Sequence, residues 1–319
     1  MARFISPAAS CAAVCALFGA GFVYPAAAAD VPALPKMPQA NMRVDSSLVL
    51  IPVHVTTPLG TSVTDLRKEN FQLFEDNGEQ TITHFAKDDA SLSIGILLDA
   101  SGSMSNKTQK CSEAAAVFLK SANPGDEFFL VEFNDKARLT VPFTTDTAEI
   151  YARVLNARPV GRTSLLDAIH LAAVQMKKAH NLRKALLIIS DGGDNCSRHN
   201  ARETRTAMLE SDVQVYALGI FGRSHPGRPT QEEENGPILL GDLAEQTGGR
   251  LYRVDRLQDL PSVSEQIGNQ LRNEYLLGYS PTNPIKDGKY RQIKLRLLAP
   301  LEAPNLRAYY RRGYYAPAE

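Results

Sequence analysis

Five hydroxyl and carboxylate side chains occur in three short clusters that each adjoin a predicted strand or helix. Asp99, Ser101 and Ser103 come at the end of an apolar strand, Thr163 precedes a helix, and Asp191 follows a second apolar strand. All five side chains offer oxygen atoms, and the clusters contain no His or Cys. Oxygen donors select hard cations, so converging clusters would bind Mg²⁺ or Mn²⁺.

The neutral hydroxyls give such a site a particular chemistry. Ser and Thr oxygens complete a coordination shell without cancelling the charge of the cation, so the bound metal stays electrophilic and can accept a carboxylate from a partner. Asp and Ser after a strand are also common helix caps, and Ser190-Asp191-Gly192 alone could form a simple turn. Three clusters in succession, each at such a junction, favour a shared metal site over capping alone.

Strands and helices alternate from Leu92 onward, which predicts the scaffold for these clusters. The predicted strands are Leu92–Leu98, Glu127–Phe133, Ala137–Phe143, Ala185–Ile189, Val213–Ile220 and Leu251–Val254. The predicted helices are Ser105–Ser121, Thr147–Asn156, Ser164–His180, Ala201–Ser211, Leu239–Thr247 and Leu260–Arg272. This alternation predicts an α/β fold, with a doubly wound, mostly parallel sheet covered by helices on both faces. Ligands of such sheets bind outside the carboxyl ends of the strands, where the clusters fall.

Strand-like segments flank this region on both sides. Ser47–Thr57 reads as a strand, and its Pro52 predicts an edge position or a bulge. Asn77-Gly78 predicts a hairpin between strand-like Phe71–Asp76 and Gln80–Phe85. Three later strands are predicted, the last with tyrosines packed inward and arginines outward: Tyr275–Tyr279, Arg291–Leu297 and Leu306–Tyr315. We expect the two flanking segments to form one small β-sandwich beside the α/β domain.

The polar clusters match a known motif. Asp99-Ala100-Ser101-Gly102-Ser103, Gly161-Arg162-Thr163 and Ser190-Asp191-Gly192 resemble the metal-ion-dependent adhesion site, or MIDAS, of von Willebrand factor type A domains. The resemblance spans about Leu92 to Tyr279 and implies that Ser101, Ser103 and Thr163 ligate the metal, with Asp99 and Asp191 binding directly or through water. The stretches FQLFEDNGEQTITHF and YYRRGYYAP are similar to the exported bacterial subgroup called acidobacterial-type, which has a β segment on each side of the domain.

The N-terminus reads as an export signal. Arg3 precedes an apolar run from about Ala8 to Val23, and small residues at Ala27 and Ala29 fit cleavage before Asp30. No later stretch is long and apolar enough to predict a membrane helix. The expected divisions are a signal peptide at 1–29, a Pro-rich linker at 30–46, an N-terminal β segment at 47–90, the type A domain at 91–280 and a C-terminal β segment at 281–319. We expect an exported protein, either periplasmic or secreted.

The leading functional hypothesis is a non-enzymatic binding module. Bound Mg²⁺ or Mn²⁺ would capture an acidic side chain of a partner protein or envelope component, and loops such as Phe221–Pro237 would set specificity. Lys+Arg and Asp+Glu both number 35, which gives no basic excess for nucleic-acid binding.

Two alternatives to this hypothesis stay open. In a phosphotransferase of the haloacid-dehalogenase type, Asp99 would be the nucleophile, with Asp191 and Asp194 near Mg²⁺. Ser101 then stands where that family needs a second Asp as general acid and base. The other alternative is a structural scaffold with an idle metal site.

Cys111 and Cys196 are the cysteines that remain after the expected signal. Both are predicted near the metal edge of the sheet, and export would place them in an oxidising compartment. We therefore expect them to be candidates for a disulfide, which would close a loop of about 85 residues and contribute roughly 4 kcal/mol in the chain-entropy model. Two free thiols are the alternative.

Overall fold

The computed structural model describes residues 48–221, 231–298 and 305–318. The expected signal peptide and linker lie outside these residues, as does part of the expected Phe221–Pro237 loop. Within the described ranges, no helix combines the length and apolarity needed to cross a membrane.

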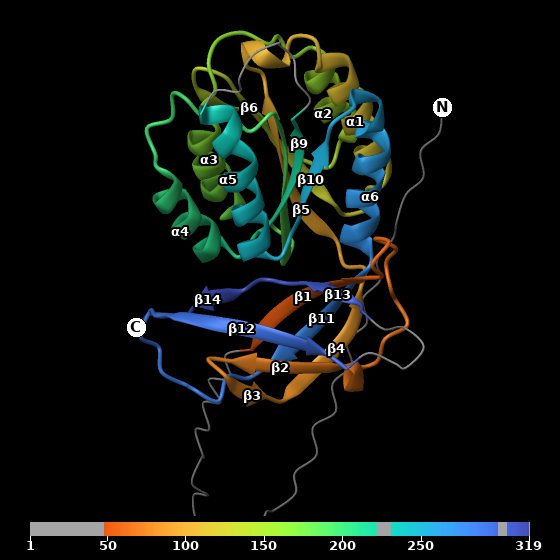
Figure 1. Ribbon diagram of the computed structural model, residues 1–319, viewed down its shortest axis with the longest axis vertical. Coiled ribbons are helices and arrows are strands. Elements are labelled where there is room, and N and C mark those ends of the chain that lie inside the picture. The colour runs from red at the N-terminus through yellow and green to blue at the C-terminus, as the bar shows by residue number, and fades with distance from the viewer. Residues whose placement is uncertain (1–47, 222–230, 299–304, 319) are drawn as a thin grey trace, which may run out of the picture. The chain divides into compact units, whose positions relative to one another are not determined.

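The central element is a six-stranded sheet in the order β10-β9-β8-β5-β6-β7 (Figure 1). Its strands are parallel except for β7, which is antiparallel to β6. The strands are β5 (Leu92–Asp99), β6 (Glu127–Phe133), β7 (Ala137–Thr144), β8 (Arg183–Ser190), β9 (Gln214–Ile220) and β10 (Leu251–Val254). The predicted α/β class with a mostly parallel sheet is confirmed.

Helices cover both faces of this sheet. They are α1 (Thr108–Lys120), α2 (Thr147–Leu155), α3 (Leu165–Met176), α4 (Ala201–Ser211), α5 (Gln231–Thr247) and α6 (Leu260–Arg272). In Figure 1, α1, α2 and α6 lie on one side and α3, α4 and α5 on the other. Alternate residues of β5 serve the two cores: Ile96 packs in the cluster that includes Phe118 of α1, and Leu97 packs in the cluster that includes Ile169 of α3. A strand buried on both faces has this apolar texture.

Helix α5 is longer than the sequence predicts. It begins at Gln231 and carries Pro237 inside it, whereas the sequence predicts a loop up to Pro237 and a helix from Leu239. The Gly236-Pro237 pair reads as a chain breaker. The first four residues of α5 are Gln and Glu, which have high helix propensity, and the glutamates are favourable near a helix N-terminus. The second half of the expected specificity loop is therefore helical.

Two four-stranded antiparallel sheets are formed by the flanking segments together. One has the order β13-β1-β11-β4, with β13 (Arg307–Tyr309), β1 (Val49–Thr56), β11 (Glu274–Tyr279) and β4 (Ile82–Asp88). The other has the order β14-β12-β2-β3, with β14 (Gly313–Tyr315), β12 (Tyr290–Leu297), β2 (Phe71–Glu75) and β3 (Gly78–Gln80). Both sheets contribute to a single apolar core that includes Ile51, Leu277, Leu73 and Ile293. The antiparallel sheets agree with the expected β-sandwich.

Two local predictions in these sheets need adjustment. The hairpin turn consists of Asp76 and Asn77, both with positive φ, so Gly78 is already the first residue of β3. The expected second strand is divided at Thr81 into β3 and β4, which belong to different sheets. Pro52 lies in an interior strand, but β13 pairs only with residues 54–56 of β1. Its missing N–H is tolerated there because β13 does not extend to this position.

Strand β11 belongs to the antiparallel sheets. The expected type A bounds, 91–280, include Tyr275–Tyr279, which the sequence analysis also groups with the flanking strands, and β11 pairs with β1 on one side and β4 on the other. Helix α6 ends at Arg272 and β11 begins at Glu274, so the chain passes directly from the α/β part to an antiparallel sheet. Its apolar pattern looks the same in either sheet, and only the pairing distinguishes them.

The expectation that the arginines near the C-terminus point outward holds for Arg307, which is exposed, but Arg311 and Arg312 contact the α/β part of the chain. Leu306–Tyr315 forms two short strands, β13 and β14, and Arg311 and Arg312 lie between them. Arg311 pairs with Asp212 and donates from Nη2 to the carbonyl oxygen of Leu50 at 2.8 Å. Arg312 Nη2 lies 3.0 Å from Glu245 Oε1 in α5. The charges are used in tertiary contacts that a strand pattern does not reveal.

Candidate metal centre

Two of the three polar clusters follow neighbouring strands, and the third lies in the loop between α2 and α3. Strands β5 and β8 are paired in parallel, so Asp99 at the end of β5 and Asp191 just after β8 reach the same edge of the sheet. Ser101 and Ser103 lie in the turn that follows β5, and Thr163 lies shortly before α3. This is the edge at which doubly wound sheets bind ligands.

Asp99 is fixed by hydrogen bonds to both of its carboxylate oxygens. The backbone N–H of Ser101 donates to Oδ1 at 2.9 Å, and Ser190 Oγ donates to Oδ2 at 2.6 Å. The residue is only 3 % exposed. Burial, with the neighbouring Asp191 carboxylate, raises the pKa of Asp99 to about 6, although the hydrogen bonds oppose this rise. The Asp99 and Asp191 carboxylates therefore repel one another, and a cation bound between them would relieve this repulsion.

The serine turn is bound to the loop that leads to Thr163. Ser101 Oγ and Ser103 Oγ are 3.0 Å apart and hydrogen bonded, with Ser101 buried and Ser103 exposed. The N–H of Gly102 donates to the carbonyl oxygen of Gly161 at 3.0 Å. Gly161 has φ +81°, and a Cβ atom there would lie 2.3 Å from Asp135 Oδ2, so this position requires glycine. The close approach of the two loops depends on that residue.

Thr163 is joined in turn to the loop that contains Asp191. Its N–H donates to Asn195 Oδ1 at 2.9 Å, and its carbonyl oxygen accepts from the N–H groups of Asn195 and Cys196 at 3.0 and 3.2 Å. The threonine is held by its backbone, so these bonds do not consume its hydroxyl. The structure thus places all five predicted residues on three loops that are hydrogen bonded to one another.

Lys107 is a site residue that the sequence analysis missed. Its Nζ lies 2.9 Å from Asp191 Oδ2, and the whole residue is 4 % exposed. It stands immediately before α1, within a segment that the sequence assigns to an ordinary helix face. The available signal was its spacing, because a residue four positions after Ser103 lies on the same side of a helical turn.

The donor set fits a hard divalent cation. Two carboxylates and three hydroxyls supply oxygen atoms only, as Mg²⁺ and Mn²⁺ prefer. In the described part of the chain, no group of three or more His, Cys, Asp or Glu side chains is arranged to hold a metal ion. A metal at this edge would therefore depend on the hydroxyls of Ser101, Ser103 and Thr163 in addition to the carboxylates.

Asp194, which the phosphotransferase alternative would place near the metal, has a structural role here. Its Oδ1 accepts hydrogen bonds from Ser197 Oγ at 2.5 Å and from the N–H of Leu166 at 3.3 Å. These bonds fix the loop after β8 to the start of α3. Burial raises the pKa of Asp194, and the bonds partly compensate this.

The disulfide expected between Cys111 and Cys196 is not formed, and both thiols are free. Cys111 is 1 % exposed and packs in the core cluster with Leu98 and Met104. Cys196 instead contacts the β6–β7 connection, with Sγ 3.7 Å from the carbonyl oxygen of Asn134. Both positions lie near the carboxyl end of the sheet, as expected. The error was to infer pairing from that shared location when one cysteine points into the core.

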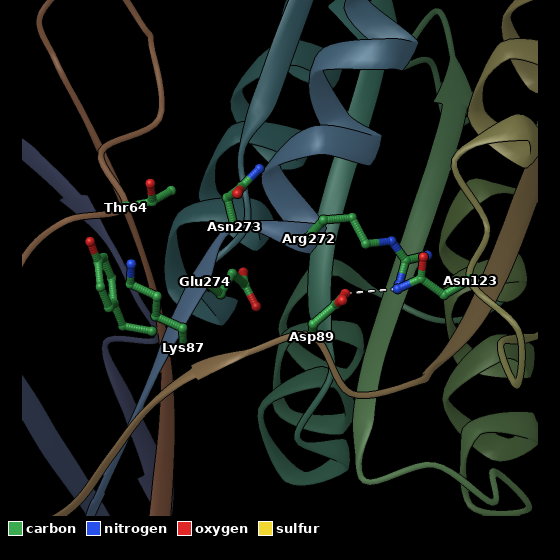
Figure 2. A pocket seen from close by; sticks show the side chains of 8 residues that line it. Thr64, Lys87, Asp89, Asn123, Arg272, Asn273 and Glu274 are labelled. Atoms are coloured by element: carbon green, nitrogen blue, oxygen red, sulfur yellow. Dashed lines mark hydrogen bonds between the residues drawn. The ribbon is translucent and has the colours of Figure 1, made fainter.

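A separate hollow of about 380 Å³ is built from other elements (Figure 2). Two of its charged side chains form ion pairs: Arg272 with Asp126, and Glu274 with Arg183. Figure 2 also shows Asn123 donating to Asp89, at 2.7 Å. The remaining lining residues are Thr64, Lys87, Asn273 and Tyr275. None of the five predicted site residues lines this hollow, so it is separate from the candidate metal centre.

Comparison with known families agrees with this architecture. Residues 94–193 match the family model described as the von Willebrand factor type A domain. A structure described as von Willebrand factor type A from Catenulispora acidiphila has a TM-score of 0.50 and 13 % sequence identity, covering 78 % of this chain and 73 % of its own. Residues 94–193 are therefore similar in sequence to a von Willebrand factor type A domain, and the six-stranded sheet with its helices has the corresponding fold.

One curated protein and one further protein of known structure are also similar to this chain. A curated UPF0353 protein from Mycolicibacterium paratuberculosis is 25 % identical over 209 residues, 58 % of this chain and 62 % of its own length, so the chain spans less than two thirds of it. Proximal thread matrix protein 1 from the mussel byssus has a TM-score of 0.50 and 17 % identity, over 62 % of this chain and 51 % of its own. A second structure of the mussel protein, with a TM-score of 0.49, is described as having a zinc-occupied MIDAS motif.

The raised pKa of Asp99 predicts a characteristic pH dependence of the metal-free protein. Because the pKa in the folded state is about 6 against an ordinary value of 3.8, folding carries a cost above pH 6 that disappears as the pH falls toward 4. In chelator, Asp99→Asn should therefore unfold at a higher Tm than the parent at about pH 7.5, and this Tm difference should shrink below pH 6 and close near pH 4. A Tm difference between Asp99→Asn and the parent that does not change with pH would contradict a raised pKa of Asp99.

Proposed function

We propose that the protein is an exported, non-enzymatic binding module that uses a divalent metal to capture an acidic side chain of a partner. Mg²⁺ or Mn²⁺ would be held by Asp99, Ser101, Ser103, Thr163 and Asp191. The observation that carries this proposal is the hydrogen-bonded junction of the three loops that contain these residues. The residues would hold the ion, and the ion would supply a Lewis-acidic position for a carboxylate.

The chemistry of the donors supports capture of an anion. Three of the five proposed ligands are neutral, and the nearby Lys107 ammonium offsets one of the two carboxylates. By formal charge, a divalent ion would leave the site with an excess positive charge that one carboxylate of a partner can neutralise. A protein side chain or an acidic component of the cell envelope would meet this requirement.

The phosphotransferase alternative is less well supported by the geometry. Asp99 is buried, and each of its carboxylate oxygens already accepts a hydrogen bond, so the group is not presented as a nucleophile. Ser101 stands where the general acid and base would be needed, and a serine hydroxyl does not titrate near neutral pH. Asp194 is engaged with the start of α3. These contacts favour a binding role.

The export part of the proposal depends on the N-terminal sequence. Residues 1–29 have the charged start, apolar run and small-residue cleavage pattern of a secretory signal. After cleavage, the remaining chain would act in the periplasm or outside the cell. The proposed partner is accordingly a protein or envelope component in the same compartment.

A metal-dependent capture experiment tests the proposal. The immobilised protein is exposed to a cell-envelope extract in Mg²⁺ or in excess chelator, with Thr163→Ala as the matched variant. We expect a partner that is retained only by the parent and only in Mg²⁺. Blocking the carboxylates of the extract with carbodiimide and a neutral amine should abolish the retention. Retention that survives chelator or carboxylate blocking would contradict capture through a metal-bound acidic group.

A further inference from the structure

We propose that Lys107 is a built-in counter-ion of the candidate metal centre, which competes with the divalent metal for the Asp191 carboxylate. This inference rests on the proposed metal-binding function and adds a control on it. The Lys107 Nζ lies 2.9 Å from Asp191 Oδ2, and only 5 % of the lysine side chain and 16 % of the aspartate side chain are exposed. An ammonium group so well shielded from water must be balanced by a nearby anion.

The charges of the site form a single cluster. Burial and the charges of Asp99 and Asp191 raise the pKa of the Cys111 thiol, whereas the charge of Lys107 opposes that rise. One thiol at the base of the site is therefore within range of all three charged groups. Without a metal, the ammonium leaves the two carboxylates with one uncompensated negative charge.

Fixed backbone contacts hold Lys107 at this position. Its N–H donates to the carbonyl oxygen of Met104 at 2.9 Å, and its carbonyl oxygen accepts from the N–H of Cys111 at 3.0 Å. Met104 and Cys111 are both buried in the same core cluster. The lysine is thus anchored between the serine turn and α1, and its ammonium is presented to Asp191 in advance of any ligand.

This arrangement has opposite effects on metal binding and on anion binding. Before a metal can use Asp191 fully, it must weaken the Lys107 contact and share the site with a like charge, which lowers metal affinity. When both cations are present, the excess positive charge strengthens attraction for a carboxylate. Lys107 would therefore make metal occupancy depend on the arrival of an anionic partner.

The test compares metal affinity in variants of the full chain by calorimetric titration with Mn²⁺. Lys107→Gln removes the charge but keeps a hydrogen-bond donor, and Lys107→Arg keeps the charge. Lys110→Gln is the matched control, since Lys110 pairs with Glu113 in α1 and is 38 % exposed. We expect Lys107→Gln to bind Mn²⁺ at least about tenfold more tightly than the parent. Lys107→Arg and Lys110→Gln should bind Mn²⁺ with the affinity of the parent.

A second readout covers variants that lose stability. With chelator, Lys107→Gln should have a lower Tm than the parent, and saturating Mn²⁺ should raise its Tm by more than it raises that of the parent. The counter-ion role would be overturned if folded Lys107→Gln bound Mn²⁺ no more tightly than the parent. It would also be overturned if Lys107→Gln were unfolded in chelator and Mn²⁺ did not restore its fold. Absence of Mn²⁺ binding in the parent and every variant would instead contradict the metal site itself.

Discussion

Replacing Arg183 with methionine is expected to lower the free energy of unfolding by about 3–5 kcal/mol, since it leaves a buried carboxylate without its cation. Arg183 in β8 pairs with Glu274 in β11, with Nη2 2.6 Å from Oε2, and the two side chains are 6 % and 1 % exposed. The same Nη2 donates to the carbonyl oxygen of Leu271 at 2.7 Å. The guanidinium therefore connects the parallel sheet, α6 and an antiparallel sheet.

The surroundings of Glu274 explain the size of this effect. Gln214 Nε2 and the Tyr216 hydroxyl lie 3.0 and 3.2 Å from its Oε1. Burial raises the pKa of Glu274, and the charge of Arg183 opposes this rise. Without Arg183, the neutral donors alone cannot replace the charge of the guanidinium, and the carboxylate must remain buried or take up a proton.

Urea unfolding of Arg183→Met and of a surface control measures this difference. Arg198→Met is the control, because Arg198 also pairs with an aspartate, Asp167, yet its side chain is 89 % exposed. Its removal should cost less than about 1 kcal/mol. Similar losses in the two variants would contradict a special role for the buried pair. The double variant Arg183→Met with Glu274→Leu should lose less stability than Arg183→Met alone, since no buried charge is left unpaired.

Replacing Thr163 with alanine is expected to weaken Mn²⁺ binding by about tenfold to a hundredfold, as it removes a proposed ligand oxygen. The backbone bonds of Thr163 to Asn195 and Cys196 do not involve the hydroxyl, so the loop should keep its conformation. Thr163→Ser is the matched control, because it retains the hydroxyl and should bind Mn²⁺ nearly as the parent does.

Calorimetric titration of Mn²⁺ into the parent, Thr163→Ala, Thr163→Ser and Ser103→Ala measures this effect. We expect both alanine variants to lose affinity and the serine variant to keep it. Binding that is indifferent to both hydroxyls would favour a site made of carboxylates alone. That result would revive the phosphotransferase alternative, in which Asp99 and Asp191 carry the chemistry.

Much of the α/β layer could be predicted from the sequence because its signals are local. A wholly apolar run such as Ala185–Ile189 is typical of a strand buried on both faces, and the helical period of Ser164–His180 is plain. The positions of Asp99 and Asp191 followed from one topological rule: parallel strands present their carboxyl ends at the same edge. Thr163 lies between α2 and α3, and the motif resemblance rather than a strand end pointed to it.

The features that escaped the sequence analysis all depend on contacts distant in the chain. Lys107 looks like any helical lysine until its partner, 84 positions away, is known. Strand β11 has the same apolar pattern whichever sheet it joins. The strand pattern alone predicts that Arg311 faces solvent, since its partner Asp212 lies 99 positions earlier in the chain. Cys111 and Cys196 reach the same end of the sheet, but the direction in which Cys111 points is set by core packing.

The proposed function depends on one divalent ion bound among the hydroxyls of the three loops. Diffraction from crystals grown with Mn²⁺, recorded at the manganese absorption edge, locates that ion directly. We expect an anomalous peak within coordination distance of Ser101 Oγ, Ser103 Oγ and Thr163 Oγ1, with Asp99 and Asp191 bound directly or through water. A fully occupied peak elsewhere, or no peak at this edge of the sheet with Mn²⁺ in excess, would rule out the proposed metal centre.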